Sequence, residues 1–408
     1  MPASPPRPRR RDTATRLDRA AAFSLASMPM PAKIAFYAPL KSPDHPIPSG
    51  DREIARAMMK ALRLAGYQVT LATETISYQK RPSSTLFCER RAACEAERDR
   101  LLGAWSHTPA TAPDLWFTYH PYCKAPDWIG PAVSQAFGIP YVTAEACRTR
   151  QATDADWAEA RAAVQAAVAG AAANFCLKPS DRAYLESFLD DPGMIVPLPP
   201  FIETAAQAPQ APPPVPFGDD APLLLAVGMM RPGAKMASYR ALATILSGLA
   251  ARRWTLVVVG DGPGRADVEA MFSELPAGRV FFAGALPKPE VAGWMGAADI
   301  FVWPGLGEAF GMSYLEAQAL GLPVAAYAAA GVPVVVTPAS GLLALEGDVE
   351  AFRANLARLI DTPALRQAIG AAGRTNVAEH HSIEAAARLF KHTLDPFLPR
   401  TRETARAR

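Results

Sequence analysis

Short apolar runs alternate with segments of helical periodicity along most of the chain. The run 33–39 predicts a buried strand, residues 52–65 place apolar side chains at helical spacing, and 67–72 predict the next strand. A strand, a loop, a helix and a second strand in this order predict the first βαβ unit of a doubly wound sheet. Further strands are predicted at 114–120, 139–144, 174–177 and 194–202, and helices at 86–105 and 156–172.

The alternation begins again after a proline-rich segment at 203–222, which predicts a semi-rigid linker. Strand 223–227 opens the second half, and a strand around 323–327 is followed by another apolar run at 334–336. Between them, strands are predicted at 254–259, 279–283 and 297–303, and the chain closes with helices at 349–361, 363–379 and 383–394. The domains expected are therefore 33–202 and 223–378, with 379–398 as a terminal helix.

Composition fits a soluble protein with sizeable cores. The chain has 408 residues, half of them hydrophobic, which favours two domains. No apolar run approaches the roughly 18 residues of a membrane span, so we expect a cytoplasmic protein, with peripheral membrane contact left open. The five cysteines form no CxxC pair, which favours reduced thiols over a zinc site.

The basic charge of the chain belongs to its two ends. Residues 1–32 carry six arginines and two aspartates, and residues 399–408 carry four arginines and one glutamate. Since the formal net charge is only +3, the body between them is net negative and gives no argument for nucleic acid. We expect both ends to be disordered basic tails, with Met28 or Met30 an alternative start.

The stretch 303–321 holds the densest candidate chemistry. Glu308 lies in a glycine-bearing loop after a predicted strand, and Glu316 lies eight positions on in the helix that follows. The amides of Phe310, Gly311 and Met312 fall at the start of that helix, where unpaired donors and the dipole favour an anion. Carboxylates for hydroxyls beside amides for phosphate suit a nucleotide sugar. An alternative is a capping box, Ser313-x-x-Glu316, in which Glu316 only satisfies a backbone donor.

Other candidates lie where predicted strands end. Arg231 and Lys235 follow Gly228 in the first strand-to-helix connection of the second domain, where they could neutralise a diphosphate. Gly50 and His120 follow strands of the first domain. The sequence Asp154-Ala155-Asp156 spells a metal-binding DxD, but it starts an alanine-rich helix, so we interpret it as helix capping and expect no metal.

Together these motifs resemble the retaining glycosyltransferases of family 4, the "glycosyl transferases group 1" type. The resemblance is carried, in order, by Gly228…Arg231…Lys235, Val259-Gly-Asp-Gly-Pro263, Phe282-Ala-Gly284, Ala298-Asp-Ile-Phe-Val302 and Glu308-x7-Glu316 with Ala309-Phe-Gly311 inside it. It covers roughly residues 220–345, and the first half matches more loosely. The chain departs from the family at Met229, where an arginine is usual, and at Val334, where a glutamate is usual.

The resemblance implies a GT-B fold: two Rossmann-like α/β domains face a cleft, and a C-terminal helix returns to the first. It implies sugar transfer from a UDP-, GDP- or ADP-sugar to an unidentified acceptor hydroxyl, with retention of configuration and without metal or cofactor. The implied roles are Glu316 for ribose, Glu308 for the donor sugar, Arg231 and Lys235 for diphosphate, residues 310–312 for sugar or phosphate, Leu286 for the base, and His120 and Gly50 near the reacting sugar.

Two other functions compete with this one. A GT-B relative without activity could bind a sugar nucleotide or serve as a subunit. A nicotinamide-dependent oxidoreductase would share the doubly wound pattern, but its G-x-G-x-x-G fingerprint is missing, since Gly260-Asp-Gly-Pro-Gly264 brings the third glycine one residue early.

Overall fold

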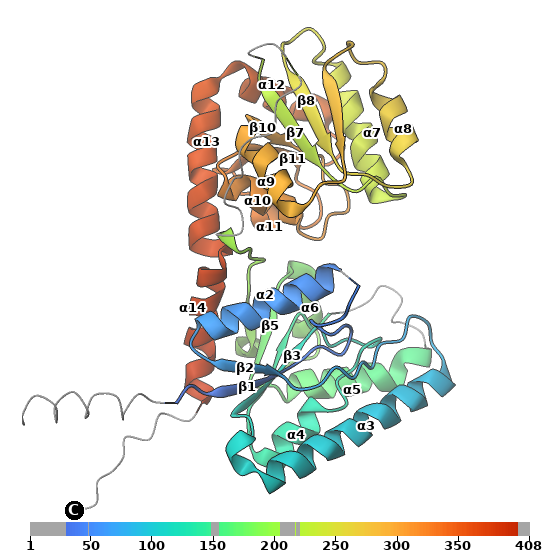
Figure 1. Ribbon diagram of the computed structural model, residues 1–408, viewed down its shortest axis with the longest axis vertical. Coiled ribbons are helices and arrows are strands. Elements are labelled where there is room, and N and C mark those ends of the chain that lie inside the picture. Colours follow the sequence, from blue (N-terminus) through green and yellow to red (C-terminus); the bar gives the residue numbers. More distant parts are fainter. Residues whose placement is uncertain (1–29, 48, 148–154, 205–216, 218–220, 399–408) are drawn as a thin grey trace, which may run out of the picture.

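The computed structural model describes residues 30–47, 49–147, 155–204, 217 and 221–398 (Figure 1). In this view two α/β units lie one above the other, and α13 and α14 run along one side of both. Residues 1–29 and 399–408 of the predicted tails fall outside the described residues, as does most of the predicted linker.

The first unit is built on a sheet of six parallel strands in the order β2-β1-β3-β4-β5-β6. The strands are β1 (Lys33–Tyr37), β2 (Gln68–Leu71), β3 (Leu115–Tyr119), β4 (Tyr141–Ala144), β5 (Ala173–Cys176) and β6 (Ile195–Pro197). Alternate residues of β1 pack on opposite faces: Ile34 and Phe36 join one core cluster, and Ala35 and Tyr37 join another. Both faces are therefore buried, as the continuous apolar runs predicted.

Helices cover the two faces of this sheet. They are α2 (Gly50–Leu64), α3 (Ser84–His107), α4 (Gly130–Phe137), α5 (Ala158–Ala169) and α6 (Pro179–Glu186), with 3-10 turns η1 (Pro109–Thr111), η2 (Ala155–Trp157) and η3 (Pro192–Met194). Helix α2 begins where the Ser49 hydroxyl accepts a hydrogen bond from the Arg52 amide at 3.3 Å. Asp51 and Glu53 in its first turn complement the helix dipole.

The second unit repeats the plan with the order β12-β11-β10-β7-β8-β9, again all parallel. Its strands are β7 (Leu223–Val227), β8 (Thr255–Val259), β9 (Val280–Gly284), β10 (Ile300–Val302), β11 (Val324–Tyr327) and β12 (Gly341–Ala344). Its helices are α7 (Ala234–Ser247), α8 (Arg265–Phe272), α9 (Lys288–Ala297), α10 (Met312–Ala319), α11 (Val332–Val335), α12 (Val349–Asp361) and α13 (Pro363–Asn376). Two doubly wound sheets confirm the predicted fold class.

The chain returns to the first unit through a π-helix, η5 (Val377–His381), and α14 (Ile383–Leu394), before the short turn η6 (Asp395–Phe397). Helix α14 packs beside α2 (Figure 1). Its Phe390 is fully buried and meets Phe117 of β3 and Phe175 of β5 at ring-centroid distances of 5.8 and 4.9 Å. The two passages between the units touch, because the Ile202 amide donates to His381 O at 2.8 Å and the Ile383 amide to Ile202 O at 2.9 Å.

Several elements differ from the prediction. Helices α4 and α6 were not predicted, since each has only eight residues and no long periodic pattern. The apolar run 334–336 does not extend a strand: it overlaps α11, and β12 lies further on. Asp156 lies in η2 and does not cap α5, whose first turn has no side-chain cap; Asp154 is outside the described residues. None of the described helices is long and apolar enough to cross a membrane.

Candidate functional site

The predicted acidic loop connects β10 to α10 at the carboxyl end of the second sheet. Gly311 is the N-cap of α10 and has a left-handed backbone with φ of 70°. Ser313 therefore lies inside the helix and not at its cap, so the capping-box alternative is wrong. The amides of Phe310, Gly311 and Met312 lie at the start of α10, where the sequence predicted an anion site.

Glu308 is joined to Lys235 by an ion pair between Nζ and Oε1, and both side chains are largely buried. The same carboxylate oxygen accepts a hydrogen bond from Trp303 Nε1 at 3.1 Å, and the Lys235 ammonium lies 5.4 Å from the Trp303 ring centroid. The prediction assigned Glu308 to the sugar and Lys235 to the diphosphate. The structure brings them together, so either would change partners when it contacts a donor.

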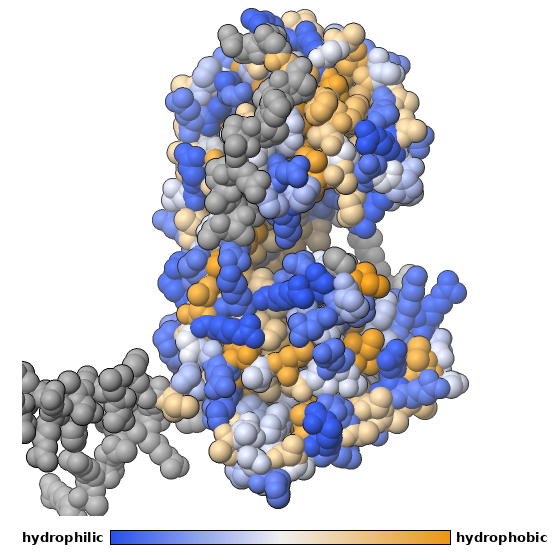
Figure 2. Space-filling model, in the orientation of Figure 1, coloured by the Kyte–Doolittle hydropathy of each residue, from blue (hydrophilic) through white to orange (hydrophobic). Residues whose placement is uncertain are grey.

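Glu316 lines a cleft of about 310 Å³ between the two units. Met312 and Lys288 lie on the same wall, and Gly50 at the start of α2 faces them from the first unit. Burial raises the pKa of Glu316 above its usual range, and the charge of Lys288 opposes that rise. A partly desolvated carboxylate in such a cleft is stabilised when it accepts hydrogen bonds from ligand hydroxyls. In the view of Figure 2, hydrophilic residues gather over α2 beside the waist between the units.

The connection after β7 is held by close backbone contacts. Tyr239 is fully buried and its hydroxyl donates to Gly228 O at 2.6 Å. A Cβ on Gly260, which has φ of 145°, would lie 1.9 Å from that same oxygen, so only glycine fits. Lys235 lies in the first turn of α7 and not in the loop. Arg231 is exposed, and among the described residues it takes part in no hydrogen bond or ion pair.

Leu286 lies between β9 and α9, two residues before Lys288. Its side chain is half-buried against the core of the second unit. The structure thus puts the predicted base-reading segment on the same side as Glu316.

At the carboxyl end of the first sheet, His120 follows β3 with a left-handed backbone, φ of 59°. Its Nδ1 lies 3.2 Å from Asp51 Oδ1 and its Nε2 lies 3.4 Å from Cys147 Sγ. The ring also stacks on Tyr122 at a centroid distance of 5.0 Å. Although burial opposes the charged form, the hydrogen bonds to Asp51 and Cys147 raise the pKa of His120 to about 10. These contacts favour the imidazolium form of His120.

A second charged group follows the neighbouring strands. Glu145, with φ of 56°, comes directly after β4 and is buried. It accepts hydrogen bonds from Tyr119 OH at 3.0 Å and Lys178 Nζ at 2.7 Å. The Lys178 ammonium lies 3.8 Å from Asp181 and, across the boundary between the units, 5.1 Å from the ring centroid of Phe310. The first unit thus presents a cation to the loop that carries Glu308.

Apart from Arg231 and Leu286, the predicted residues fall into three groups. Gly228, Lys235, Glu308, Phe310, Gly311 and Met312 lie around the connections after β7 and β10, Gly50 and Glu316 face each other across the cleft, and His120 lies at the edge of the first sheet. Glu145, Lys178 and Asp51 were missed as site residues. The signal of Glu145 and Lys178 was only a polar residue directly after an apolar run, which many turns share. Asp51 lies in the first turn of α2, where an acidic residue is common because it complements the helix dipole. Among the described residues no group of three or more His, Cys, Asp or Glu could hold a metal ion.

Comparison with known proteins identifies the second unit. Residues 221–362 match the family model "Glycosyl transferases group 1". The chain has the GT-B fold, and its second unit resembles the group 1 glycosyltransferases. The match begins two residues before β7 and ends after α12, so it contains Lys235, Glu308 and Glu316.

Curated relatives of this GT-B protein match over about a third of the chain. The 2-deoxystreptamine glucosyltransferase of Streptomyces kanamyceticus is 40% identical over 144 residues, which are 34% of this chain and 37% of the relative. The GDP-mannose-dependent monoacylated alpha-(1-6)-phosphatidylinositol monomannoside mannosyltransferase of Corynebacterium glutamicum is 38% identical over 136 residues, 32% and 35% of the two chains. The match thus spans about a third of each relative.

Solved structures match the GT-B protein over both units. The sucrose-phosphate synthase of Thermosynechococcus elongatus superposes with a TM-score of 0.61 and 20% identity, covering 90% of this chain and 98% of that one. Anabaena Alr3699/HepE in complex with UDP and glucose gives a TM-score of 0.60 at 14% identity, covering 90% and 100%. At these identities the superpositions support the fold alone.

Proposed function

We propose that this protein transfers a sugar from a nucleoside diphosphate sugar to an acceptor hydroxyl, with retention of configuration and without a metal. The donor is a UDP-, GDP- or ADP-sugar, which lies along the second unit with its ribose at Glu316. The observation that carries the proposal is the pairing of Lys235 with Glu308 beside the start of α10, inside a group 1 domain.

The chemistry requires charge stabilisation more than a nucleophile. Negative charge builds on the departing diphosphate while the sugar becomes oxocarbenium-like, and fixed donors aimed at that charge lower the barrier. Lys235 and the amides at the start of α10 are such donors. Glu308 accepts a hydrogen bond from a hydroxyl of the donor sugar when Lys235 turns to the phosphates. The bond between the anomeric carbon and the diphosphate breaks, and the acceptor oxygen bonds to that carbon on the same face. Its proton passes to the leaving phosphate, and attack on that face retains the configuration.

Relatives support the donor class. One is GDP-mannose-dependent by name, and the Anabaena structure contains UDP. We place the acceptor beside His120, because this residue lies at the carboxyl edge of the facing sheet, where open α/β folds bind ligands.

Removal of the paired lysine tests the assignment. Lys235→Ala should lower kcat for donor turnover by about 10²-fold or more, as for loss of other oxyanion donors, and Arg231→Ala should do the same if it reaches the diphosphate. Arg240→Ala, an exposed change on the same helix, is the matched control. The measurement is release of nucleoside diphosphate from a panel of UDP-, GDP- and ADP-sugars, with and without EDTA, and NMR of the anomer formed. Unchanged turnover in Lys235→Ala would contradict the diphosphate role.

A GT-B protein that binds a sugar nucleotide without turnover is the second candidate. Met229 at the family's usual arginine position and an exposed, unpaired Arg231 favour it. Calorimetry with UDP, GDP and ADP separates the two functions: binding of one nucleotide without hydrolysis or transfer from any of its sugars would support the inactive form.

A further inference from the structure

Trp303 contacts both members of the Lys235–Glu308 pair. It follows β10 directly and is fully buried, at the carboxyl end of the second sheet. Its Nε1 donates to Glu308 Oε1 at 3.1 Å, and the Lys235 ammonium lies 5.4 Å from the centroid of its ring. An indole has a single polar hydrogen, which needs an acceptor when the ring is buried. In Trp303 this hydrogen is directed at the carboxylate that we assign to the donor sugar.

The ring of Trp303 is held by the connection after β7. Tyr239 of α7 meets it edge-on, with the ring centroids 4.9 Å apart and an angle of 78° between the planes. A Cβ on Gly228 would lie 2.9 Å from Trp303 Cη2, so the backbone of Gly228 lies close to the far edge of the indole. A fully buried ring packed in this way has little freedom to move. Trp303 therefore joins the connection after β7 to the loop that carries Glu308.

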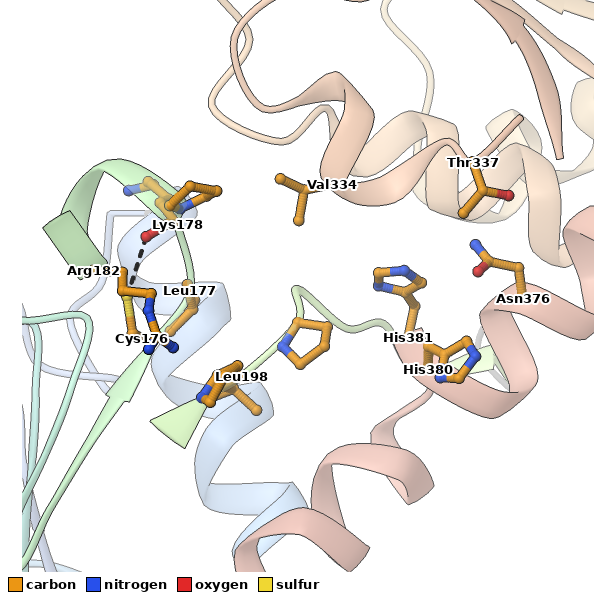
Figure 3. Close-up of a pocket in the computed structure, with 13 residues that line it drawn as sticks. Cys176, Leu177, Lys178, Arg182, Leu198, Val334, Thr337, Asn376, His380 and His381 are labelled. Carbon is orange, nitrogen blue, oxygen red and sulfur yellow. Dashed lines mark hydrogen bonds between the residues drawn. The ribbon is translucent and has the colours of Figure 1, made fainter. Parts of the chain in front are cut away.

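The backbone of Glu308 is fixed by a second contact. Its carbonyl accepts a hydrogen bond from the Gly331 amide at 3.1 Å, and α11 begins directly after Gly331. Val334 of α11 lines a cavity of about 410 Å³, and Figure 3 shows Lys178 on the wall that the first unit contributes to this cavity. Lys178 is held by Glu145 at 2.7 Å, so it is not free to pair with Glu308.

Binding of a donor requires Lys235 and Glu308 to separate. Within the described chain, the Glu308 carboxylate takes part in two contacts, one with Lys235 and one with Trp303. When Lys235 turns to the phosphates, the Trp303 N–H stays, because the packed ring cannot follow the lysine. A carboxylate that is held by one fixed donor keeps its other oxygen available for a sugar hydroxyl, in a defined position.

We propose that Trp303 is a positioning residue for the donor sugar and acts through Glu308. Its N–H holds the Glu308 carboxylate after Lys235 has turned to the phosphates, and its ring face keeps the Lys235 ammonium at the site when no donor is bound. The role concerns recognition of the sugar and not of the nucleoside diphosphate. It rests on the proposed function for the assignment of Glu308 to the sugar, but it does not require turnover.

Trp303→Phe removes the N–H and keeps an aromatic face for Lys235. Calorimetry on the full chain uses UDP, GDP and ADP, each alone and with glucose or mannose attached. Affinity for the nucleoside diphosphate should stay within about 2-fold of the wild type, whereas affinity for its sugar nucleotide should fall about 10-fold, as for loss of a hydrogen bond to a charged group. The ratio of the two affinities is therefore the quantity to compare.

Trp254→Phe is the matched control. Trp254 is also buried, its Nε1 donates to Leu249 O at 2.8 Å, and the Arg279 guanidinium lies 5.2 Å from its ring centroid. It precedes β8 and so lies at the amino edge of the same sheet, away from the donor. Trp254→Phe should lower the Tm about as much as Trp303→Phe and leave the ratio of affinities unchanged.

A double variant tests whether Trp303 acts through Glu308. In Glu308→Ala the acceptor of the N–H is gone, so adding Trp303→Phe should weaken the sugar nucleotide by less than about 2-fold more. Equal weakening of nucleoside diphosphate and sugar nucleotide in Trp303→Phe, or the full loss also beside Glu308→Ala, would overturn the proposal. If Trp303→Phe does not fold, benzothienylalanine in place of Trp303 decides, because it keeps the shape of the indole without the N–H.

The binding measurements separate this role from the proposed function. Wild-type protein that binds a sugar nucleotide without transferring its sugar overturns the proposed function alone. Transfer by the wild type with an unchanged affinity ratio in Trp303→Phe overturns the role of Trp303 alone. Wild-type protein that binds none of the sugar nucleotides overturns both.

Discussion

The two sheets turn their carboxyl edges toward each other, yet the edges are built differently. In the second unit the site is shaped by backbone: Gly260 lies against Gly228 O, and a Cβ on Gly331 would lie 1.6 Å from Ala309 O. In the first unit it is shaped by charged side chains on strained backbone, at His120 and Glu145. Non-glycine residues in the left-handed region cost about 1 kcal/mol each. At the first edge this backbone strain accompanies the positions of the His120 and Glu145 side chains.

The difference has a consequence for function. A backbone cradle suits a ligand part that is always the same, such as a diphosphate, because amides do not change their chemistry. A cluster of side chains suits a ligand that differs between relatives. The second unit is accordingly the half that matches the family model, at residues 221–362.

The largest effect is expected at the backbone cradle. Gly331→Ala should lower donor turnover by about 10²-fold or more, because the new Cβ displaces the loop at Ala309, next to Glu308, whose carbonyl accepts from the Gly331 amide. Its φ of −88° suits alanine, so the effect is steric alone. Turnover and Tm are measured beside Gly103→Ala, where nothing lies within 4 Å of the new Cβ. Full activity in Gly331→Ala would remove the contrast between the two edges.

A middle-sized effect is expected at Lys178. Lys178→Met should lower the free energy of unfolding by about 3 kcal/mol, because Glu145 is left charged and buried. The double variant with Glu145→Gln should recover part of the loss, since only Asp181 is then left without its cation. Urea unfolding of the wild type and three variants gives the coupling energy. Additive losses would mean that the two residues do not act as a pair.

The smallest effect is expected at Asp51. Its side chain is 39% exposed, so the Asp51–His120 contact contributes about 1 kcal/mol or less. The pKa of His120 is raised in the folded protein. The stability that its charged form contributes is therefore fully present below the pKa of the unfolded state, and it is lost as the pH rises through about 10. The pKa of Asp51 is lowered, mainly by the hydrogen bond to His120. The stability that the Asp51 carboxylate contributes is therefore lost only as the pH falls through that lowered pKa.

Imidazole NMR titration measures this contact. In Asp51→Asn the pKa of His120 should fall by at least about one unit from the wild-type value. An unchanged pKa would show that Cys147 and burial, and not Asp51, set the state of the ring.

The sequence predicted the second edge better than the first for a physical reason. Glycines that fit only at close backbone contacts, and carboxylates at fixed spacing from a helix start, lie within short stretches such as 303–321. Glu145 and Lys178 come from different strands and meet only because β4 and β5 are neighbours. Nothing in the linear order of the chain indicates that they touch, and no pattern indicated that Lys178 faces Phe310.

Some predictions failed for local reasons. The ion pair between Lys235 and Glu308 was not predicted, because spacing gives no information on which side chains pair across a loop. Val334 lies on a helical turn because Gly331 and Pro333 start α11 where a strand had seemed natural. Strand and helix order, by contrast, followed from apolar periodicity, since both faces of each sheet are buried.

The packing of α14 on α2 makes the first unit discontinuous in sequence. A fragment that stops at Glu203 would leave Phe117 and Phe175 without Phe390, and would lack the partner of Tyr67, whose hydroxyl donates to Asp395 at 2.7 Å. Chimeras that exchange the second unit between relatives should therefore replace only the middle of the chain, about 221–378. Both ends of the chain should come from one parent.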